Sequence, residues 1–517
     1  MKRLILLPLL FCCLFQQVRA QTKPMNIVVL LADDWRFDTL GCAGNPVVKT
    51  PNLDRLAMDG LRFTRFYTTS RCWASRAAIL TGHYPQAIRR DLLPEVDRGE
   101  YGMFGTISGA NGIRPRWAQM LPAYLKQAGY RSYHSGKWHM DGDRLPAGFD
   151  MRVVAEALQP VGESSYRWHI FPDGGGVMAK PDGGWFYLSN SEVPGFGSLG
   201  FTVPELAPLA NPLERLTPGL GGASAIEFDR DGNIVDAFQI LSGTTFNCAG
   251  CVTPWQTWLS CEEIPEGLVW ECDPVGRSTA QSRPTLGLFS HEAVAIDAGR
   301  RVIYMTEDMP EGRLYRWLPA AGDWPAGGRP ALAKGVLQVM DVPTGVAKAL
   351  TTPQRVIWRD ALEPTKAQSE HRREDSAAFD GGEGIWLFDD FIFFATKGDN
   401  RIWVYDIQGE TLEVLYDLAT DSNPILSGVD NITVTDRGDV LVAEDGGDMQ
   451  IVVILPDGQL KPLLQIVGQD QSEVAGIAFS PDGRRLYFTS DRGSNQDVGG
   501  QRVGLGVTYE LMLPAGL

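Results

Sequence analysis

Acidic side chains recur at one place in a repeated pattern that fills the C-terminal two thirds of this chain. Each stands near the start of a short apolar run: Glu263, Glu292, Glu383, the pair Asp430 and Asn431, and Glu473. Carboxylates that converge on one channel repel each other unless cations neutralise them, so the pattern predicts a metal centre. Sites built only from oxygen favour calcium, and one added thiolate, here Cys248, favours a transition metal such as iron. Such ions polarise an ester and supply a hydroxide nucleophile.

The elements that must position these acids are strands. From about residue 144, β-branched and aromatic runs alternate with Asp-Gly and Gly-Asn turns, which are hairpin signals. Six units share this form, one ending at Glu192 and the others starting at Ala223, His291, Gly382, Val429 and Glu473. We therefore expect a mainly β fold, a six-bladed β-propeller whose inner strands face a central channel; a two-sheet sandwich is the alternative. Residues 320–380 have weaker strand signals and are expected to form an insertion or loop.

The strings NCAGCVTPWQTWLSCEE, HEAVAID, GEGIW and GIAFSPDGRRLYFTSDRG carry a family resemblance. From about residue 144 to 517 the chain resembles the PhoX-type alkaline phosphatases. The resemblance implies a centre of iron and calcium at the mouth of the channel, with Cys248 as a bridge and Glu263 as a ligand. It implies further candidate ligands: Glu292, Glu383, Asp430, Asn431 and Glu473, with Glu444 and Asp445 as weaker ones.

The match has one gap at the expected phosphate-binding position. Active members of that family tend to carry an arginine two residues before the Glu of the GEG string, and this chain has Gly381 there. Arg372 and Arg373 are the nearest substitutes in the sequence. His291, which precedes Glu292, is interpreted as a structural residue.

A second set of motifs lies near the N-terminus. Asp33 and Asp34 follow an apolar run, CWASR spans Cys72–Arg76 ahead of AAILTGHYP, and GKWH spans Gly136–His139. In this order the motifs resemble the N-terminal part of the sulfatase family, over about residues 25–143. In that family the cysteine becomes formylglycine, whose hydrate attacks the sulfate ester.

The sulfatase resemblance implies a role for each matched residue. Asp33, Asp34 and a formylglycine at Cys72, made by a sulfatase-maturating enzyme, would be calcium ligands. Arg76 would support the nucleophile, and Lys137 and His139 would contact the sulfate. The later half of a sulfatase, which supplies a second pair of metal ligands, has no counterpart after residue 143. The string TSDRG at Thr489–Gly493 is interpreted as the end of a propeller strand.

The N-terminal segment is expected to form a truncated α/β module. Residues 26–31 form a continuous apolar run, typical of a strand buried on both faces, and residues 130–134 are a candidate second strand. Residues 50–60 predict a helix that ends at Gly60, and residues 117–129 predict another.

Composition limits the class of protein. The chain has 517 residues, 44% hydrophobic, and a net charge of -16, which excludes wholesale disorder and disfavours binding to nucleic acid. Residues 1–20 have a basic start, an apolar stretch too short to span a bilayer, and a small-residue cleavage site. We interpret them as a signal peptide and expect a secreted or periplasmic protein without a membrane span.

Six cysteines remain after the leader: Cys42, Cys72, Cys248, Cys251, Cys261 and Cys272. An exported protein can form disulfides, and Cys261 with Cys272 is the favoured pair. A zinc ribbon is disfavoured because only Cys248 and Cys251 form a C-x-x-C pair.

The sequence therefore predicts an exported, metal-dependent hydrolase of small phosphate esters. Two alternatives remain at this stage. One is sulfate-ester hydrolysis by formylglycine at Cys72. The other is a propeller that is stabilised by calcium and acts as a binding module without catalysis.

Overall fold

The computed structural model describes two parts of the chain. The described residues are 26–32, 35–36, 38–66, 72–84, 87, 118–134, 151–193, 221–276, 278–466, 469, 472–493, 496–498 and 501–513. The chain divides into two compact units, Met1–Ala118 with His139–Asp141, and Gln119–Trp138 with Gly142–Leu517. The expected leader, residues 1–20, lies outside the described residues. Among those described, no helix has the length and apolar character needed to cross a membrane.

The first unit contains short helices. They are η1 (Gly41–Ala43), α1 (Pro51–Asp59) and α2 (Cys72–Thr81). The expectation of a helix that ends at Gly60 is confirmed, since the Gly60 N–H closes the last turn on Leu56. The strand expected at residues 26–31 is wrong: this segment is unpaired, and the Val28 and Leu30 side chains are 78% and 77% exposed. A β-strand needs a neighbouring strand for its backbone hydrogen bonds, and the described residues of this unit contain no other strand.

The second unit begins with α3 (Leu121–Gln127), shorter than the helix expected at residues 117–129. The strand expected at residues 130–134 does not form; these residues belong to no strand or helix. Beyond this segment the regular elements of the described residues are strands, apart from two short 3-10 helices.

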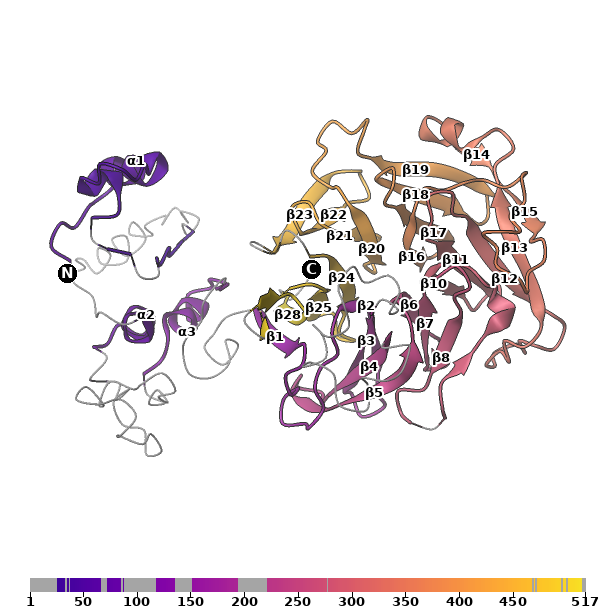
Figure 1. The fold of residues 1–517 in the computed structure, drawn as a ribbon, viewed down its shortest axis with the longest axis horizontal. Coiled ribbons are helices and arrows are strands. Elements are labelled where there is room, and N and C mark those ends of the chain that lie inside the picture. The colour runs from indigo at the N-terminus through magenta and orange to yellow at the C-terminus, as the bar shows by residue number, and fades with distance from the viewer. Residues whose placement is uncertain are drawn as a thin grey trace, which may run out of the picture. The chain divides into compact units, whose positions relative to one another are not determined.

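Six sheets surround a central axis, with β2, β6, β10, β16, β20 and β24 innermost (Figure 1). The six-bladed β-propeller expected from the sequence is confirmed. The first blade is β2 (Pro172–Ala179), β3 (Trp185–Ser191), β4 (Gly221–Phe228) and β5 (Ile234–Thr244). The second is β6 (Asn247–Val252), β7 (Trp258–Glu262), β8 (Val269–Cys272) and β9 (Gln281–Ser282). The third is β10 (His291–Asp297), β11 (Val302–Glu307), β12 (Leu314–Pro319), β13 (Gly335–Asp341) and β15 (Ile357–Asp360), preceded by η6 (Pro284–Leu286).

The remaining blades follow the same antiparallel order. The fourth is β16 (Gly382–Phe388), β17 (Phe391–Thr396), β18 (Arg401–Asp406) and β19 (Thr411–Asp417), with β14 (Gln354–Arg355) at its edge and η7 (Val346–Leu350) beside it in the chain. The fifth is β20 (Val429–Val434), β21 (Val440–Glu444), β22 (Gln450–Ile454) and β23 (Leu460–Gln465). The sixth is β24 (Val474–Phe479), β25 (Arg485–Ser490), β28 (Val507–Met512) and β1 (Met151–Glu156). A hairpin of β26 (Gln496–Val498) and β27 (Gln501–Val503) precedes β28.

The ring closes because the sixth blade takes its outer strand from the start of the propeller. β1 pairs antiparallel with β28, and Arg152 forms an ion pair of 3.1 Å with the buried carboxylate of Glu510. The indole of Trp168 also donates a hydrogen bond to the Thr508 hydroxyl, at 3.0 Å. Joining the two ends of the repeat in one sheet removes the free edges that an open ring would have.

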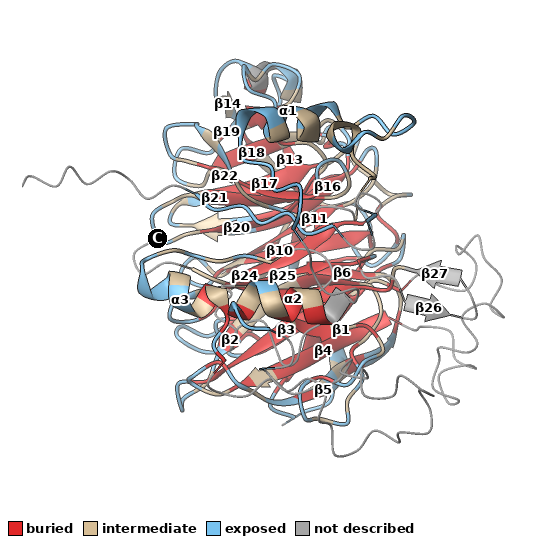
Figure 2. Cartoon of the chain, turned by 90° about the vertical axis from the view of Figure 1, so that its left-hand side faces the viewer, coloured by how far each residue is buried: buried red, intermediate tan, exposed pale blue. Residues whose placement is uncertain are grey.

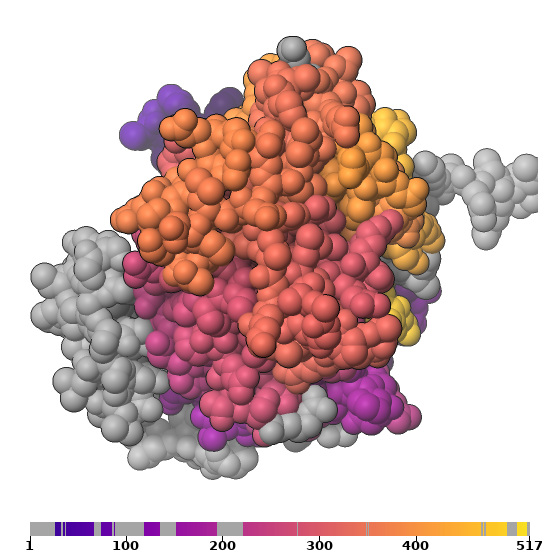
Figure 3. Space-filling view, turned by 90° about the vertical axis from the view of Figure 1, so that its right-hand side faces the viewer, coloured from indigo at the N-terminus to yellow at the C-terminus, as the bar shows by residue number. Residues whose placement is uncertain are grey.

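Apolar side chains fill the spaces between neighbouring blades. Phe393 and Ile402 of the fourth blade, for example, pack with Ile432, Val442 and Val452 of the fifth. The strands therefore carry buried residues along most of their length (Figure 2). Seen from the side that carries β12, β13 and β15 in Figure 1, segments coloured from magenta to orange adjoin across one continuous surface (Figure 3). This packing fixes the inner strands and the residues at their ends.

The number of predicted units was right, but one of them was misplaced. The unit expected to start at Ala223 is the outer hairpin β4–β5 of the first blade, not a blade of its own. The blade that completes the count begins with β6 at Asn247, a segment distinguished in the sequence by its cysteines rather than by the repeat. Residues 320–380, expected to form an insertion or loop, contribute β13, β14 and β15 to two blades.

Each inner strand has an irregularity in its pairing near its start. In β16 the register shifts between Gly382 and Ile385, and equivalent shifts occur in the other five inner strands. A β-bulge of this kind bends the strand and redirects a side chain. The bulges here turn the residues at the strand starts toward the channel.

Glycine is required at one of these bulges because two backbones meet there. A Cβ atom on Gly384 would lie 2.5 Å from the Ile432 nitrogen and 2.8 Å from the Asn431 Cα. We expect Gly384→Ala to lower the free energy of unfolding by about 1–3 kcal/mol, because neighbouring inner strands must separate. Urea unfolding measures this loss. Gly299→Ala, whose Cβ would meet only the Asp297 carboxylate at 3.4 Å, is the matched control; equal loss in both variants would contradict the explanation.

Candidate metal centre

The first set of residues at the channel comes from the starts of the inner strands. In five blades the residue after the first paired position is a potential metal ligand: Asp173, Cys248, Glu292, Glu383 and Asp430. In the sixth blade the acid is Glu473, which directly precedes β24 and whose backbone forms an isolated antiparallel β-bridge with Asp445. All six side chains are buried. The propeller symmetry therefore places one donor from every blade at the same end of the channel.

A second set comes from the residue that directly follows the second strand of each blade. The six residues are Glu192, Glu263, Asp308, Lys397, Asp445 and Asp491. Five are acids and one is a lysine. Since the second strand runs antiparallel to the first, its last residue lies beside the start of the inner strand. The two sets together form what we call the acidic ring.

The ring offers four groups of possible ligand atoms within 4.8 Å of one another. The groups are Glu192–Cys248–Glu263, Glu192–Glu473–Asp491, Glu292–Glu383–Asp430 and Asp430–Asp445–Glu473. Glu192, Asp430 and Glu473 each belong to two groups. The groups therefore adjoin rather than lying on separate faces of the molecule.

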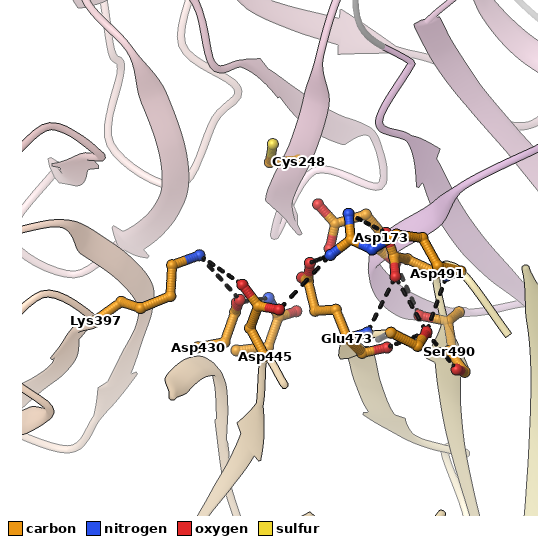
Figure 4. Close-up of polar contacts among 12 residues, drawn as sticks. Asp173, Cys248, Lys397, Asp430, Asp445, Glu473, Ser490 and Asp491 are labelled. Atoms are coloured by element: carbon orange, nitrogen blue, oxygen red, sulfur yellow. Dashed lines mark hydrogen bonds and ion pairs between the residues drawn. The ribbon is translucent and has the colours of Figure 1, made fainter. Parts of the chain in front are cut away.

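Among the described residues, two cations contact the ring, both on the side of the fourth, fifth and sixth blades. The Lys397 ammonium lies 2.9 Å from the Glu383 carboxylate. It also lies 3.1 Å from the carboxylate of Asp445 and 3.8 Å from that of Asp430 (Figure 4). Arg492 lies 3.0 Å from the Asp491 carboxylate and 3.4 Å from that of Glu473. The carboxyl groups of the ring outnumber these two cations several-fold.

Burial makes ionisation of the ring acids costly without further cations. Burial, with Asp430 and Asp491 nearby, raises the pKa of Asp173 well above its ordinary value. Burial also raises the pKa of Glu263 to about 7, with Asp308 adding to the rise, and that of Asp491 to about 6. The Asp173 Oδ1 atom is buried and has no hydrogen-bond partner among the described residues. A bound cation would satisfy that oxygen and allow the acids to ionise.

Cys248 lies among carboxylates. Its Sγ donates a hydrogen bond of 3.1 Å to Glu263, and its pKa is raised by burial and then by Glu263 and Glu292. The Asn190 amide holds the strand in place through bonds of 2.9 and 2.8 Å to the carbonyl oxygens of Cys248 and Ala249. A thiol in this setting ionises only when a metal ion lowers its pKa.

Most of the propeller residues predicted from the sequence lie together in the four donor groups, whereas Asn431 and Glu444 have other hydrogen-bond roles. Cys248, Glu263, Glu292, Glu383, Asp430 and Glu473 all belong to the four donor groups, as does Asp445. Asn431 instead accepts the Gly476 N–H at 3.0 Å and donates to the Asp430 carboxylate at 2.7 Å, which suits positioning of that carboxylate. Glu444 accepts the N–H groups of Ser427 and Gln450 and is part of the local backbone structure.

The two arginines considered as phosphate-binding substitutes are engaged elsewhere. Arg372 forms an ion pair with Glu307, which is fully buried at the end of β11. Arg373 pairs with Asp375 at 2.8 Å. The His291 Nε2 atom donates a hydrogen bond to the Gly287 carbonyl at 3.2 Å, and the ring centroid lies 3.6 Å from that of Phe289, consistent with a structural residue. Arg492 is the arginine at the ring.

Sequence reasoning missed five members of the ring, Asp173, Glu192, Asp308, Lys397 and Asp491, and also Arg492, which pairs with ring acids. A usable signal was present, since a charged residue follows the second strand of every blade. It becomes visible only after the blades are aligned by their strands.

The residues matched to sulfatase motifs are mostly beyond what the structure describes. Asp33, Asp34, Lys137 and His139 lie outside the described residues. Cys72 begins α2, although its side chain is not described, and Arg76 is buried one turn later on the same helix. Their predicted roles remain predictions.

The favoured disulfide is not formed. Cys42, Cys248, Cys251, Cys261 and Cys272 are free thiols. In the β7–β8 hairpin Cys261 pairs with Val269 and Cys272 with Trp258, so the two cysteines lie three positions apart, roughly 10 Å along the strands. That separation exceeds the reach of a disulfide.

Comparison with known proteins separates the two parts of the chain. Residues 221–402 match the family model described as alkaline phosphatase PhoX. Residues 25–159 match the sulfatase family model. The two resemblances found in the sequence are thus confirmed, in the predicted order.

A solved structure supports the fold of the second part. It is described as Pseudomonas fluorescens PhoX in complex with vanadate, a transition state analogue. It superposes with a TM-score of 0.56 at 16% identity and covers 70% of this chain and 94% of that one. At this identity the likeness shows a shared propeller fold.

The sulfatase relatives are similar over a limited region. Human arylsulfatase A is 40% identical over 122 residues, 23% of this chain and 22% of the relative. Human N-acetylgalactosamine-6-sulfatase is 41% identical over 134 residues, 25% of each protein. The chain thus spans about a quarter of the length of the curated sulfatases it matches.

Proposed function

We propose that the propeller hydrolyses small phosphate esters at metal ions held by the acidic ring. The observation that carries this proposal is the convergence of donors from all six blades, with one thiol and a buried, unpartnered Asp173 oxygen among them. The match of residues 221–402 to the PhoX phosphatase family supports the class of reaction. Both matched families support a hydrolase.

The donor set fits metal ions of two kinds. Glu192, Cys248 and Glu263 combine one sulfur with carboxylate oxygens, which favours a transition metal such as iron. The groups around Asp430 offer oxygen alone, which favours calcium. When bound, such ions supply Lewis-acid polarisation of the phosphate oxygens and a hydroxide nucleophile near neutral pH.

Two residues that contact the ring, Arg492 and Asn431, bind and orient. Arg492 pairs with Asp491 and Glu473, yet its side chain is 41% exposed, so it can also contact a phosphate oxygen at the channel mouth. Its planar guanidinium suits two phosphate oxygens at once. Asn431 holds the Asp430 carboxylate through its amide. In this assignment Arg492 binds the phosphate in place of the arginine that the family resemblance leads one to expect at position 381, where this chain has Gly381.

The proposal is tested by metal analysis joined to an ester panel. The purified protein, supplied with iron and calcium, is expected to release phosphate from small phosphate monoesters and to lose this activity on chelation. Calcium bound without turnover of any ester would favour the binding-module alternative. Absence of bound metal together with absence of turnover would overturn the proposal.

Sulfate-ester hydrolysis at Cys72 is a second candidate, favoured by the match of residues 25–159 and by CWASR at the start of α2. It requires formylglycine at Cys72 and calcium at Asp33 and Asp34. Mass spectrometry of the peptide containing Cys72 detects the aldehyde.

Because we assign phosphate release to the propeller, we expect Cys72→Ala to retain it in full. The same ester panel measures this result. Loss of phosphate release in Cys72→Ala would contradict the assignment. Loss of sulfate release alone would establish the second activity.

We place the protein outside the cytoplasm, in the periplasm or secreted. This placement rests on the leader interpreted at residues 1–20 and on the exported enzymes typical of both matched families. N-terminal sequencing of the mature protein tests it, with cleavage after Ala20 as the expected result.

A further inference from the structure

Lys397 is the exception in the second set of ring residues. The other five blades place Glu192, Glu263, Asp308, Asp445 or Asp491 directly after the second strand, and the fourth blade places a lysine there. The local geometry is the same as in the other blades: β17 ends at Thr396, and Lys397 follows directly, as its counterparts do. The position of the lysine is therefore equivalent to that of a carboxylate ligand.

The Lys397 ammonium occupies the space between two donor groups. It lies 2.9 Å from Glu383, 3.1 Å from Asp445 and 3.8 Å from Asp430. Glu383 and Asp430 belong to one donor group, and Asp430 and Asp445 to another. Burial lowers the pKa of Lys397, but Glu383, Asp430, Glu473 and Asp445 raise it above its ordinary value, so the side chain is a permanent cation.

The compensating charge is unevenly distributed around the ring. Lys397 and Arg492 pair with acids of the fourth, fifth and sixth blades. In the described part of the chain no ion pair reaches Glu192, Glu263 or Glu292. Arg492 and Lys397 act on the Cys248 side only from a distance, where they lower the pKa of Glu192 and of Glu263, while the Lys397 side is partly neutralised by direct ion pairs.

We propose that Lys397 takes the place of one divalent cation in the acidic ring, and that removing its charge opens a further calcium site. The inference rests on the proposed function, since it assumes that the rest of the ring holds metal. The opened site is bounded by Glu383, Asp430 and Asp445, all of them oxygen donors. Such a site favours calcium over a transition metal. The unpartnered Asp173 oxygen shows that the ring has coordination capacity beyond what Lys397 and Arg492 satisfy.

The test counts calcium ions in variants of the full chain. Lys397→Met keeps the length of the side chain and removes its charge, and we expect it to bind one more calcium ion per chain than the wild type by elemental analysis after dialysis. Lys397→Arg keeps the charge and is expected to bind the wild-type number. Lys180→Met is the matched control, because Lys180 pairs with Asp182 and Glu227 outside the four donor groups.

A second variant and a second readout guard against misfolding. Lys397→Glu restores the acid found in the other five blades, and we expect it to bind the extra calcium even if Lys397→Met folds poorly. Both variants should gain more in thermal unfolding temperature from added calcium than the wild type gains. If neither variant, folded or not, binds a further calcium ion, the inference is overturned.

The outcomes distinguish this inference from the proposed function. A metal-loaded wild type with an unchanged count in both variants overturns the role of Lys397 alone. A wild type that binds no metal, with calcium binding in Lys397→Glu, supports the role of Lys397 and overturns the metal-dependent mechanism. Absence of metal from every variant overturns both.

Discussion

Cys248→Ser is expected to lower phosphate-ester hydrolysis by more than about 100-fold. The thiol is the only sulfur in the four donor groups found among the described residues, and it contacts Glu263 at 3.1 Å. Loss of even an outer partner of a metal ligand typically costs about 10–100-fold in metal affinity or activity. Serine replaces a soft ligand by a weak hard one, so iron content should fall together with activity. The ester panel and elemental analysis measure the two effects on the same preparations.

Cys251→Ala provides the control for this prediction. Cys251 lies on the same strand, β6, but packs against apolar side chains and belongs to no donor group in the described part of the chain. Its replacement should leave iron content and phosphate release near wild type. Retention of full activity by Cys248→Ser at full metal load would contradict a role for Cys248 as a ligand.

Removal of metal is expected to destabilise the propeller, and more so at high pH. One ion at about 1,000 times its Kd contributes about 4 kcal/mol. At roughly 2–4 °C per kcal/mol, its loss lowers the unfolding temperature by about 8 °C or more. Scanning calorimetry of the protein with and without a chelator measures this difference.

The sign of the pH effect follows from the raised pKa values of the ring acids. The pKa of Glu263 rises from 4.5 to about 7, and that of Asp491 from 3.8 to about 6. A raised pKa in the folded state means stability that is present below about pH 4 and is lost as the pH rises through 6 to 7. The metal-free protein should therefore unfold at a lower temperature at pH 8 than at pH 5.

The metal-loaded protein supplies the comparison, because cations replace protons as partners of the carboxylates. Its unfolding temperature should change less between pH 5 and pH 8 than that of the metal-free protein. Glu263→Gln, which cannot ionise, should reduce the pH dependence of the metal-free form. Equal pH dependence with and without metal would show that the ring acids do not bind it.

The propeller could be predicted because its signals are local and repeated. An acid stands near the start of most inner strands, so the repeat and the resemblance to PhoX phosphatases singled out Glu292, Glu383 and Asp430. The blade that begins at Asn247 was missed as a repeat because its fourth strand, Gln281–Ser282, is only two residues long. The hairpin at Ala223 was counted as a blade instead, because the outer two strands of a blade alternate apolar and polar residues in the same way as the inner two.

The rest of the ring could not be predicted because it depends on alignment between strands. Glu192 and Asp308 read as ordinary polar residues after a strand. The antiparallel register places Asp308 beside the start of β10, and the packing of neighbouring blades brings Glu192 close to Cys248. Lys397 breaks the acidic pattern and could be interpreted only from its distances to Glu383 and Asp445. At residues 26–31 the apolar run predicted a strand, but a strand needs a partner that a single run does not reveal.

The most direct test of the account is anomalous X-ray diffraction from crystals of the purified, metal-loaded protein. We predict an iron peak bounded by Glu192, Cys248 and Glu263, and calcium density beside Glu292, Glu383 and Asp430. An absence of anomalous signal at this end of the channel, in protein that still releases phosphate, would contradict the central claim that the ring holds the catalytic ions.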